Sequence, residues 1–344
     1  MSNKMTSMDR VLTTLGHKEP DRVPLFLLLS VYGAKESNQS IKSYFSDPKQ
    51  VAKTQLHMKK KYQNDCYDAF YYASLEMEAF GGESIFFDEG PPNSGDAIIM
   101  PDDSIKKLIP PKINDCKKLL DVLETIRIIK DESKGDAPII GVVMSPFSLP
   151  VMQMGFDKYL DLIADHTELF EHLMKVNTEF CVEWANAQLE AGATAICYFD
   201  PVSSPTIIPR EKYMETGFKI AKQTISRING PTATHLASGR TVSVIEDIAQ
   251  TGTAVLGVSS EDDLSIVKDK CRNKLTILGN LDGIKMCRWN KTETENEVKK
   301  IISKAASGGG LIISDNHGEI PFQVSEETLL TISDTIREFG KYKN

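Results

Sequence analysis

The sequence has 344 residues, of which 41% are hydrophobic and 26% are charged, as in an ordinary water-soluble globular protein. No apolar run reaches the ~18 residues of a membrane-spanning helix, and the N-terminus lacks the apolar segment of a signal peptide. The net charge is −8, with acids and bases mixed along the chain, which argues against nucleic-acid binding and against a polybasic membrane surface. We therefore expect a cytoplasmic protein.

The six cysteines show neither a CxxC motif nor the regular spacing of a disulfide framework, so they are expected to be free thiols. Cys197 lies in an apolar, strand-like run, where packing is a better explanation than reactivity.

Short apolar runs alternate with amphipathic segments of helical length, the pattern of repeated βα units. A capped helix beginning near Thr6 is expected within an N-terminal extension, residues 1–22. The expected strands are residues 23–30, 68–72, 138–144, 193–199, 231–235, 254–258, 275–278 and 310–314. The expected helices are residues 49–62, 119–130, 159–163, 165–191, 211–228, 242–250, 263–271, 292–306 and one from residue 326.

Residues 88–111 are rich in Pro, Gly and Asp, which predicts a hairpin or loop excursion over one end of the core. The chain has no GxGxxG turn and no Walker loop, so a closed barrel is favoured over an open doubly wound sheet. The prediction is an α/β fold, a single (β/α)8 TIM-barrel domain over residues 1–344, with the N-terminal helical extension and the inserted excursion.

In such a barrel the residues that follow the strands share one mouth. Two histidines, His235 and His317, follow different strands and are the predicted catalytic pair. The predicted ligand-binding side chains around them are Glu76, Glu78, Asp200, Asn280, Asp315 and Asn316. Carboxylates, amides and imidazoles suit a neutral ligand with many N–H donors and carbonyl acceptors better than a phosphate. Single carboxylates could instead only start a turn, as Asp200 before Pro201, or cap a helix.

A metal site is less well supported, because Ala237 stands where an H-x-C zinc motif starting at His235 would have its cysteine. Two histidines with a carboxylate could still hold zinc or iron, and this alternative stays open.

Seven segments resemble the uroporphyrinogen decarboxylase superfamily and, within it, the cobalamin-dependent methyltransferase branch. They are EPDRVP (19–24), LEMEAFGG (75–82), SPFSLPVMQMG (145–155), YFDPVSSPTIIPREKY (198–213), GPTATHLASG (230–239), LGNLD (278–282) and NHGEIP (316–321). The resemblance covers essentially the whole chain. The order of the seven segments is more specific to this superfamily than any one segment alone.

Two subfamilies can be compared with these segments. True decarboxylases resemble the chain in HGxxP, but they carry an arginine-rich run after the first strand where this chain reads LLLSVYGAKES. Methylcobalamin:coenzyme M methyltransferases resemble it in ExEAxG, at Glu76 and Glu78, and use an H-x-C zinc motif with a distant second cysteine. Here Ala237 replaces the first cysteine, and His317 or Gly318 the second, which implies that the thiol-activating zinc is lost.

The resemblance therefore implies a zinc-independent methyltransferase. It would move a methyl group from methylcobalamin, carried by a separate corrinoid protein, to N5 of tetrahydrofolate, as in the demethylation of methylated amines such as glycine betaine or of aryl ethers in anaerobes. The pterin would be bound by Asp200, Asn280, Asp315, Asn316, Glu76 and Glu78, with no metal. The alternatives are a thiol-directed, coenzyme M-type methyltransferase and a non-catalytic corrinoid- or pterin-binding module.

Two further sets of residues are predicted around the mouth. Single basic residues that could meet the glutamate tail of the folate are Arg210, Arg240 and Lys285. Apolar residues that could form a docking rim for the corrinoid protein are Phe147, Met152, Met154 and Phe322.

Overall fold

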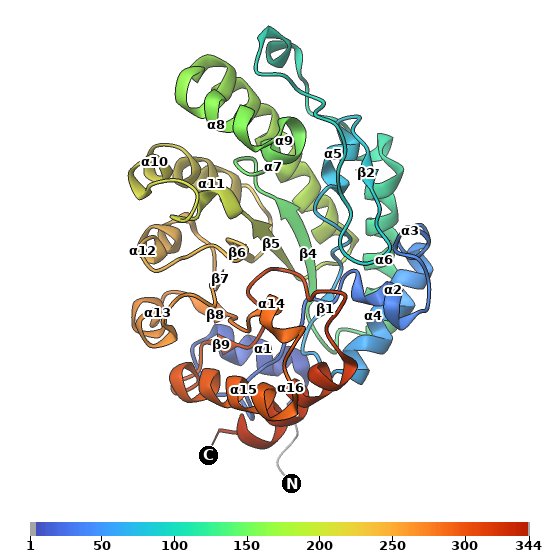
Figure 1. The fold of residues 1–344 in the computed structure, drawn as a ribbon, viewed down its shortest axis with the longest axis vertical. Coiled ribbons are helices and arrows are strands. Elements are labelled where there is room, and N and C mark those ends of the chain that lie inside the picture. The colour runs from blue at the N-terminus through green and yellow to red at the C-terminus, as the bar shows by residue number, and fades with distance from the viewer. Residues whose placement is uncertain (1–4, 343–344) are drawn as a thin grey trace.

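The structure is a computed structural model that describes residues 5–342. Its centre is a parallel sheet in the order β1-β4-β5-β6-β7-β8-β9, surrounded by helices (Figure 1). The strands are β1 (Tyr67–Asp68), β4 (Ile139–Met144), β5 (Ala195–Phe199), β6 (Thr232–His235), β7 (Val255–Gly257), β8 (Thr276–Leu278) and β9 (Leu311–Ile312). The predicted TIM-barrel class is confirmed, and seven of the eight expected strands are present within a few residues.

The eighth position of the barrel is filled by an extended segment rather than by a regular strand. On one side of this segment, Leu25 forms a parallel bridge with Ile313, next to β9. On the other side, the Leu25 N–H donates to Asp65 Oδ2 and the Leu27 N–H to Asn64 Oδ1, both at 2.9 Å. Side chains from the turn before β1 therefore replace part of the ladder and close the barrel.

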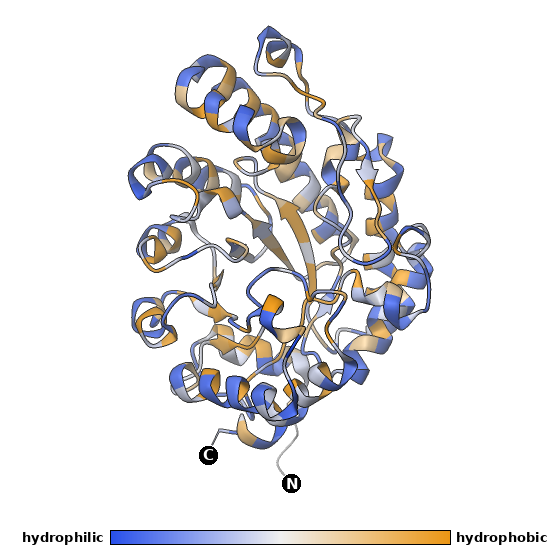
Figure 2. Cartoon of the chain, viewed as in Figure 1, coloured by the Kyte–Doolittle hydropathy of each residue, from blue (hydrophilic) through white to orange (hydrophobic). Residues whose placement is uncertain are grey.

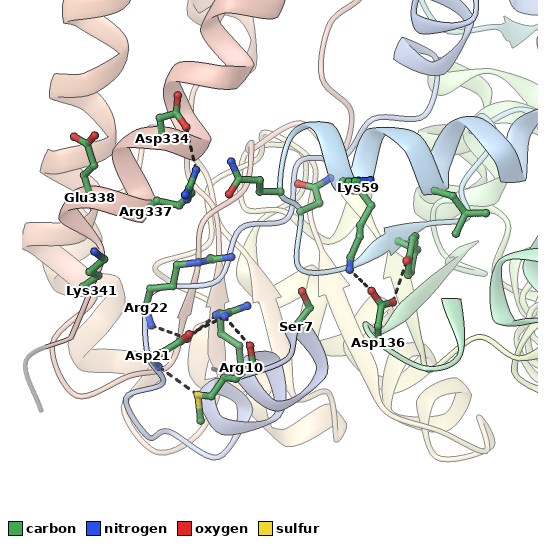
Figure 3. A pocket seen from close by; sticks show the side chains of 16 residues that line it. Ser7, Arg10, Asp21, Arg22, Lys59, Asp136, Asp334, Arg337, Glu338 and Lys341 are labelled. Carbon is green, nitrogen blue, oxygen red and sulfur yellow. Dashed lines mark hydrogen bonds and ion pairs between the residues drawn. The ribbon is translucent and has the colours of Figure 1, made fainter. Parts of the chain in front are cut away.

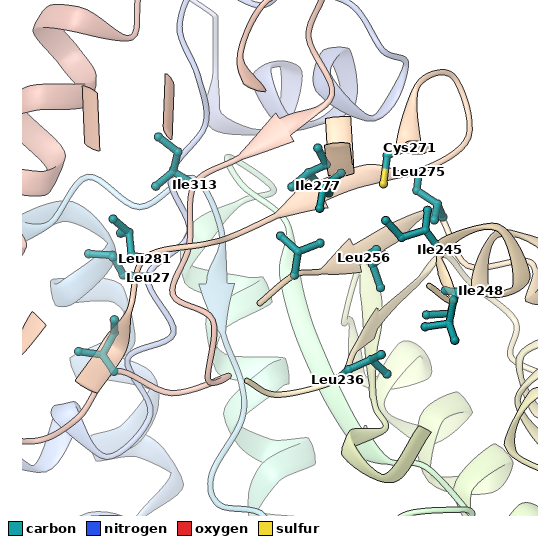
Figure 4. Close-up of a cluster of buried hydrophobic side chains, with 14 of the residues drawn as sticks. Leu27, Leu236, Ile245, Ile248, Leu256, Cys271, Leu275, Ile277, Leu281 and Ile313 are labelled. Carbon is teal, nitrogen blue, oxygen red and sulfur yellow. The ribbon is translucent and has the colours of Figure 1, made fainter. Parts of the chain in front are cut away.

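The outer helices present their apolar faces to the strands and their polar faces outward (Figure 2). They are α4 (Pro48–Lys61), α6 (Lys117–Ser133), α9 (Thr167–Ala191), α11 (Gly217–Ile225), α12 (Ile245–Ile248), α13 (Leu264–Cys271), α15 (Lys291–Ala305) and α16 (Glu326–Phe339). Between the later strands and helices lies a continuous cluster of buried aliphatic side chains, among them Leu236, Ile245, Leu256 and Ile277 (Figure 4). This cluster ties the strands to the helical ring.

The shorter helices lie mostly in the connections. They are α1 (Ser7–Leu15), α2 (Tyr32–Glu36), α3 (Ile41–Tyr44), α5 (Leu75–Ala79), α7 (Leu149–Met154), α8 (Phe156–Asp165), α10 (Arg210–Glu215) and α14 (Gly283–Met286). The expected N-terminal helix is confirmed as α1, where Thr6 and Asp9 form a reciprocal capping box. Residues 1–4 of the expected extension lie outside the described residues.

Three sequence-based boundaries were wrong. The expected helix 211–228 is broken at Thr216, between α10 and α11. The excursion begins before residue 88, because β2 (Ser84–Ile85) already pairs with β3 (Asn93–Ser94) as an antiparallel hairpin. The strand expected at 68–72 is β1, which ends at Asp68. Within residues 5–342, no helix combines the length and the apolar character needed to cross a membrane.

A cavity of about 870 Å³ lies beside residues that precede the strands, at the end of the barrel away from the histidines. Its charged side chains are mostly bonded to one another (Figure 3), as in the pair of Lys59 with Asp136. Behind it, the fully buried Asp65 accepts from Arg10 at 2.6 Å and from Arg22 at 2.8 Å. Ion pairs therefore stabilise this end of the barrel, and we interpret its role as structural.

Candidate functional site

His235 is the last residue of β6 and is completely buried. Its ring stacks on Phe199, the last residue of β5, with the ring centres 5.3 Å apart and the planes at 22°. On the β7 side, Gly257 makes room for the ring, because a Cβ at this glycine would lie 2.3 Å from His235 Cδ2. The side chain is thus held in one position by its neighbours on both adjoining strands.

The hydrogen bonds of His235 determine which ring nitrogen carries the proton. The Ala237 N–H donates to Nδ1 at 3.0 Å, so the neutral ring carries its proton on Nε2. Burial, helped by the positive charge of His317 when that ring is protonated, lowers the pKa of His235 to about 4. At neutral pH His235 is therefore an uncharged N–H donor, and its buried Nε2 has no hydrogen-bond partner among residues 5–342.

His317 has the opposite arrangement. Its Nδ1 lies 2.7 Å from Asn316 Oδ1, an acceptor, so Nδ1 carries the proton and Nε2 is the acceptor when the ring is neutral. The amide orientation of Asn316 is supported by its Nδ2, which donates to Ser260 Oγ at 3.1 Å. In their neutral forms, the partly exposed His317 therefore offers an acceptor at Nε2, whereas the buried His235 offers an N–H donor at Nε2.

Three carboxyl groups lie close to the histidines: Asp68 and Asp315 are buried, and Glu319 is partly exposed. Asp315 accepts from the backbone N–H groups of His317 and Gly318 through Oδ2, both at 2.9 Å, and its Oδ1 is unpaired. Asp68 accepts from the Phe70 N–H at 3.0 Å and has an unpaired Oδ2. Glu319 accepts from Ser30 Oγ at 2.8 Å. Buried polar atoms are nearly always paired, so the two unpaired oxygens indicate room for a water or ligand partner.

Burial raises the pKa values of all three carboxyl groups, and repulsion between the groups adds to the shifts of Asp68 and Glu319. Burial raises the pKa of Asp68 to about 7, and the negative charge of Asp315 contributes. Burial raises the pKa of Glu319 to about 8, with further contributions from Asp68 and Asp315. The pKa of Asp315 is also raised by burial. Because like charges at one site cannot all ionise easily, this group keeps at least one proton near neutral pH.

Asp68 and Glu319 were missing from the sequence-based site. Asp68 was assigned to the start of a strand, although it is the last residue of β1 and so lies at the mouth. Glu319 is the glutamate of the NHGEIP segment, and its carboxylate accepts from Ser30 Oγ and from the Val31 N–H, which lie just after the first extended segment. A strand that ended at Asp68 instead of Tyr72, four residues earlier, would have indicated Asp68.

Other predicted residues are engaged elsewhere in the structure. Asp200 accepts from the hydroxyls of Ser145, Ser148 and Ser203 at 2.5 to 2.7 Å, so most of its acceptor capacity is used within the protein. Asn280 donates from Nδ2 to the Ser259 carbonyl at 2.8 Å. Both residues hold the connections around His235, and Asp200 also donates its backbone N–H to the His235 carbonyl.

The two glutamates of α5 are separate from the histidine cluster. Glu76 accepts from the Met144 N–H at 2.8 Å and keeps Oε2 unpaired, and burial raises its pKa to about 8. Glu78 accepts from the Tyr72 hydroxyl at 3.0 Å. The structure therefore brings Asp315, Asn316 and the two histidines together, but it gives Glu76 and Glu78 partners of their own.

The structure also bears on the basic residues predicted for the folate tail and on the predicted apolar docking rim. Each basic residue has an acidic partner: Arg210 with Asp247, Arg240 with Glu261 and Lys285 with Asp282. For the rim, Phe147 and Met154 are buried, which contradicts their prediction as docking residues, because both side chains pack into the core. Met152 and Phe322 are partly exposed.

The side chains at this site do not match the zinc set implied by thiol-activating relatives. Among residues 5–342, no three or more His, Cys, Asp or Glu side chains are grouped so that they could hold a metal ion. The lone pair of His235 is at Nδ1, where the Ala237 N–H already binds it. Zinc at Nε2 would require the proton to move to Nδ1, where it would face that N–H donor.

The fold and these side chains define a (β/α)8-barrel protein with a buried histidine and carboxyl cluster at the carboxyl ends of its strands. Residues 6–339 match the family model described as uroporphyrinogen decarboxylase (URO-D), and the chain belongs to this family.

The individual relatives are of two kinds, methylcobamide:CoM methyltransferases and uroporphyrinogen decarboxylases. The chain is 27% identical over 161 residues to the methylcobamide:CoM methyltransferase MtaA of Methanosarcina barkeri, covering 46% of this chain and 47% of the relative. It is 26% identical over 331 residues to the uroporphyrinogen decarboxylase of Wigglesworthia glossinidia brevipalpis, covering 90% and 89%. Among solved structures, a methyltransferase from Methanosarcina mazei has a TM-score of 0.86 at 21% identity, covering 97% and 99%. The match spans about half the length of the MtaA relatives, and the structural likeness supports the fold.

Proposed function

We propose that the protein is a methyltransferase that moves a methyl group from methylcobalamin, bound to a partner corrinoid protein, to N5 of tetrahydrofolate without zinc. The single observation that carries this proposal is the fixed pair of histidines with opposite roles, His235 as a donor and His317 as an acceptor. The similarity to a methylcobamide methyltransferase supports the methyl donor. In the described part of the chain, the Ala237 N–H already occupies His235 Nδ1 and the candidate ligands are not grouped around a metal position, which supports an acceptor other than a thiol.

The proposed methyl transfer forms one bond, breaks one bond and releases one proton. The N5 lone pair of tetrahydrofolate forms a bond to the methyl carbon, the bond between cobalt and carbon breaks, and the corrinoid keeps the electron pair as cob(I)alamin. N5 gains a positive charge and must lose its proton. His317 Nε2 accepts this proton, directly or through one water, because it is the unprotonated nitrogen of a partly exposed ring.

The pterin would be held by the groups that have unpaired atoms in the structure. His235 Nε2 donates to a carbonyl or ring nitrogen, while the free oxygens of Asp315 and Asp68 accept from the N–H groups of the aminopyrimidinone. Asp200 contacts the His235 carbonyl through its backbone N–H, and Asn316 orients His317. Asn280 holds the neighbouring connection at the Ser259 carbonyl. Catalysis would depend mainly on positioning N5 against the methyl group.

Decarboxylation of a polycarboxylate is less well supported. A porphyrinogen brings several negative charges, which the cluster of Asp68, Asp315 and Glu319 would repel. Lys35, the basic residue of the segment after the first extended run, donates instead to the Phe322 and Val324 carbonyls at 2.9 and 3.0 Å.

A second candidate is a thiol-directed methyltransferase, because the printed name of the M. barkeri relative specifies coenzyme M as the acceptor. The two candidates are separated by the absorbance change of methylcobalamin under anaerobic conditions, with either tetrahydrofolate or coenzyme M, each with and without a strong chelator. Turnover with tetrahydrofolate that is insensitive to the chelator supports the proposal. Turnover with the thiol alone, lost on chelation, would assign the activity to a zinc enzyme.

The same assay tests the histidines. We expect His235→Ala and His317→Ala to lose methyl transfer to tetrahydrofolate, while His57→Ala is unchanged because His57 is an exposed side chain on α4. If both site variants kept binding to the corrinoid partner and neither the wild type nor the variants turned over, a non-catalytic binding module would replace the proposal.

A further inference from the structure

The interior of the barrel is less densely filled than its outer face. On β4, the outward residues Ile139 and Val143 are buried, whereas Ile140 and Val142, which point into the barrel, are partly exposed. On β5 the same reversal occurs, with buried Ile196 and Tyr198 alternating with partly exposed inward residues. Barrels of this type are usually filled by layers of bulky side chains. Here the inward positions border an internal space.

The space exists because small residues occupy inward positions on neighbouring strands, Ala195 and Cys197 on β5 and Ala233 on β6. They line a cavity of about 120 Å³ along the barrel axis. An engineered apolar cavity of about 150 Å³ in another protein stays dry and binds benzene or xenon. The volume therefore fits one ring of benzene size.

The wall of this cavity selects for an uncharged aromatic ligand. Three rings, those of Phe26, Phe70 and Phe199, and two thiols, Cys66 and Cys197, contribute to it. Burial raises the pKa of Cys197 to about 12, so the thiol is uncharged, and sulfur packs favourably at ring edges. The polar side chains of Asp68 and His235 line the cavity at the end beside the candidate site. Away from that end, a charged or strongly polar ligand would lose its hydration without a partner.

Side chains of α1 line the cavity at the end away from the histidines. Leu12 of α1 lines the cavity and is nevertheless 54% exposed, so this side chain separates the interior from the surface. At the other end the cavity reaches Phe199 and His235, directly beneath the candidate site. We propose that the barrel interior is a binding site for one small, uncharged aromatic molecule that enters past Leu12.

The test uses fluorobenzene and the full-length protein. Binding is followed by the ¹⁹F NMR signal of the ligand and by the rise in the unfolding midpoint with ligand concentration, since a ligand that binds only the native state stabilises it. Ala233→Leu places an isopropyl group in the cavity and should abolish both effects. Ala97→Leu, the same change at an exposed position of the excursion, should leave both unchanged.

Saturable binding by the wild type and by Ala97→Leu, lost in Ala233→Leu, supports the proposal. The absence of saturable binding by the wild type, or equal binding by Ala233→Leu, overturns it. If Ala233→Leu does not fold, Cys197→Met fills the same space with a flexible side chain and is judged by the same criteria. Neither measurement depends on methyl transfer, so this result is independent of the proposed function.

Discussion

Replacing Gly257 with alanine should displace His235 without changing any polar group. The added Cβ would lie 2.3 Å from His235 Cδ2 and 2.6 Å from Cγ. Ordinary contacts at such positions begin at 3.4 Å, so the ring must retreat by roughly 1 Å. The retreat is hindered, because Phe199 stacks on the ring and itself lies against Gly318.

Two magnitudes follow from this displacement. Overpacking of a filled site costs about 1–3 kcal/mol of unfolding free energy. A misplacement of about 1 Å in a positioned catalytic group lowers the rate on the order of 100-fold. The first is measured by urea unfolding and the second by anaerobic methylcobalamin demethylation with tetrahydrofolate.

A double-mutant cycle isolates the cause. In a His235→Ala background there is no ring to displace, so Gly257→Ala should cost almost nothing in stability. Gly283→Ala serves as a graded comparison, because its Cβ would lie 3.2 Å from His317 Nδ1 and demands only a small adjustment. If Gly257→Ala destabilised both backgrounds equally, the clash with His235 would not be its cause and the reasoning would be refuted.

Three other predictions concern single side chains. Asp65→Ala should lower the free energy of unfolding, measured in urea, by about 3–5 kcal/mol, because it removes one of the two carboxylates that pair with the buried Arg10. A loss below about 1 kcal/mol would contradict this prediction. Burial raises the pKa of Asp68 from 3.8 to about 7, so the native carboxyl keeps a proton that the unfolded chain releases, and native stability falls as pH rises through this window. Asp68→Asn should therefore lose less stability between pH 5 and pH 8 than the wild type, and an equal or larger loss in urea unfolding would count against it. His317→Gln should lower kcat with tetrahydrofolate by about 100-fold or more, because an amide cannot accept the proton; a change of only a few-fold would move that role to a carboxyl group.

Much of the barrel was predictable because its strands are short apolar runs with distinct ends. The order of strands and helices follows from the alternation of these runs with amphipathic segments, and it placed His235 and His317 at one mouth. The carboxyl group of Asp68 was missed for a local reason. The aromatic residues after it extend the apolar pattern beyond the true end of β1, so the strand was shifted toward the C-terminus.

The hydrogen-bond partners of the polar residues could not be predicted from the sequence. Asp200 looks like a free carboxylate in YFDP, but hydroxyls from two connections, at Ser145, Ser148 and Ser203, converge on it. Such convergence depends on the relative placement of loops distant in sequence. The burial of Phe147 had the same cause, because the loop after β4 folds inward onto α8 and α9.

The seam of the barrel constrains how the chain can fold during synthesis. The apolar segment around Leu25 leaves the ribosome long before its partner Ile313, which lies far along the chain. At about 5–20 residues per second, the wait lasts roughly 15 to 60 s, during which VPLFLLLS has no sheet neighbour on that side. The nascent chain therefore carries an unpaired, aggregation-prone edge throughout this interval, and its yield in a cell should depend on chaperones that shield this edge until Ile313 has been synthesised.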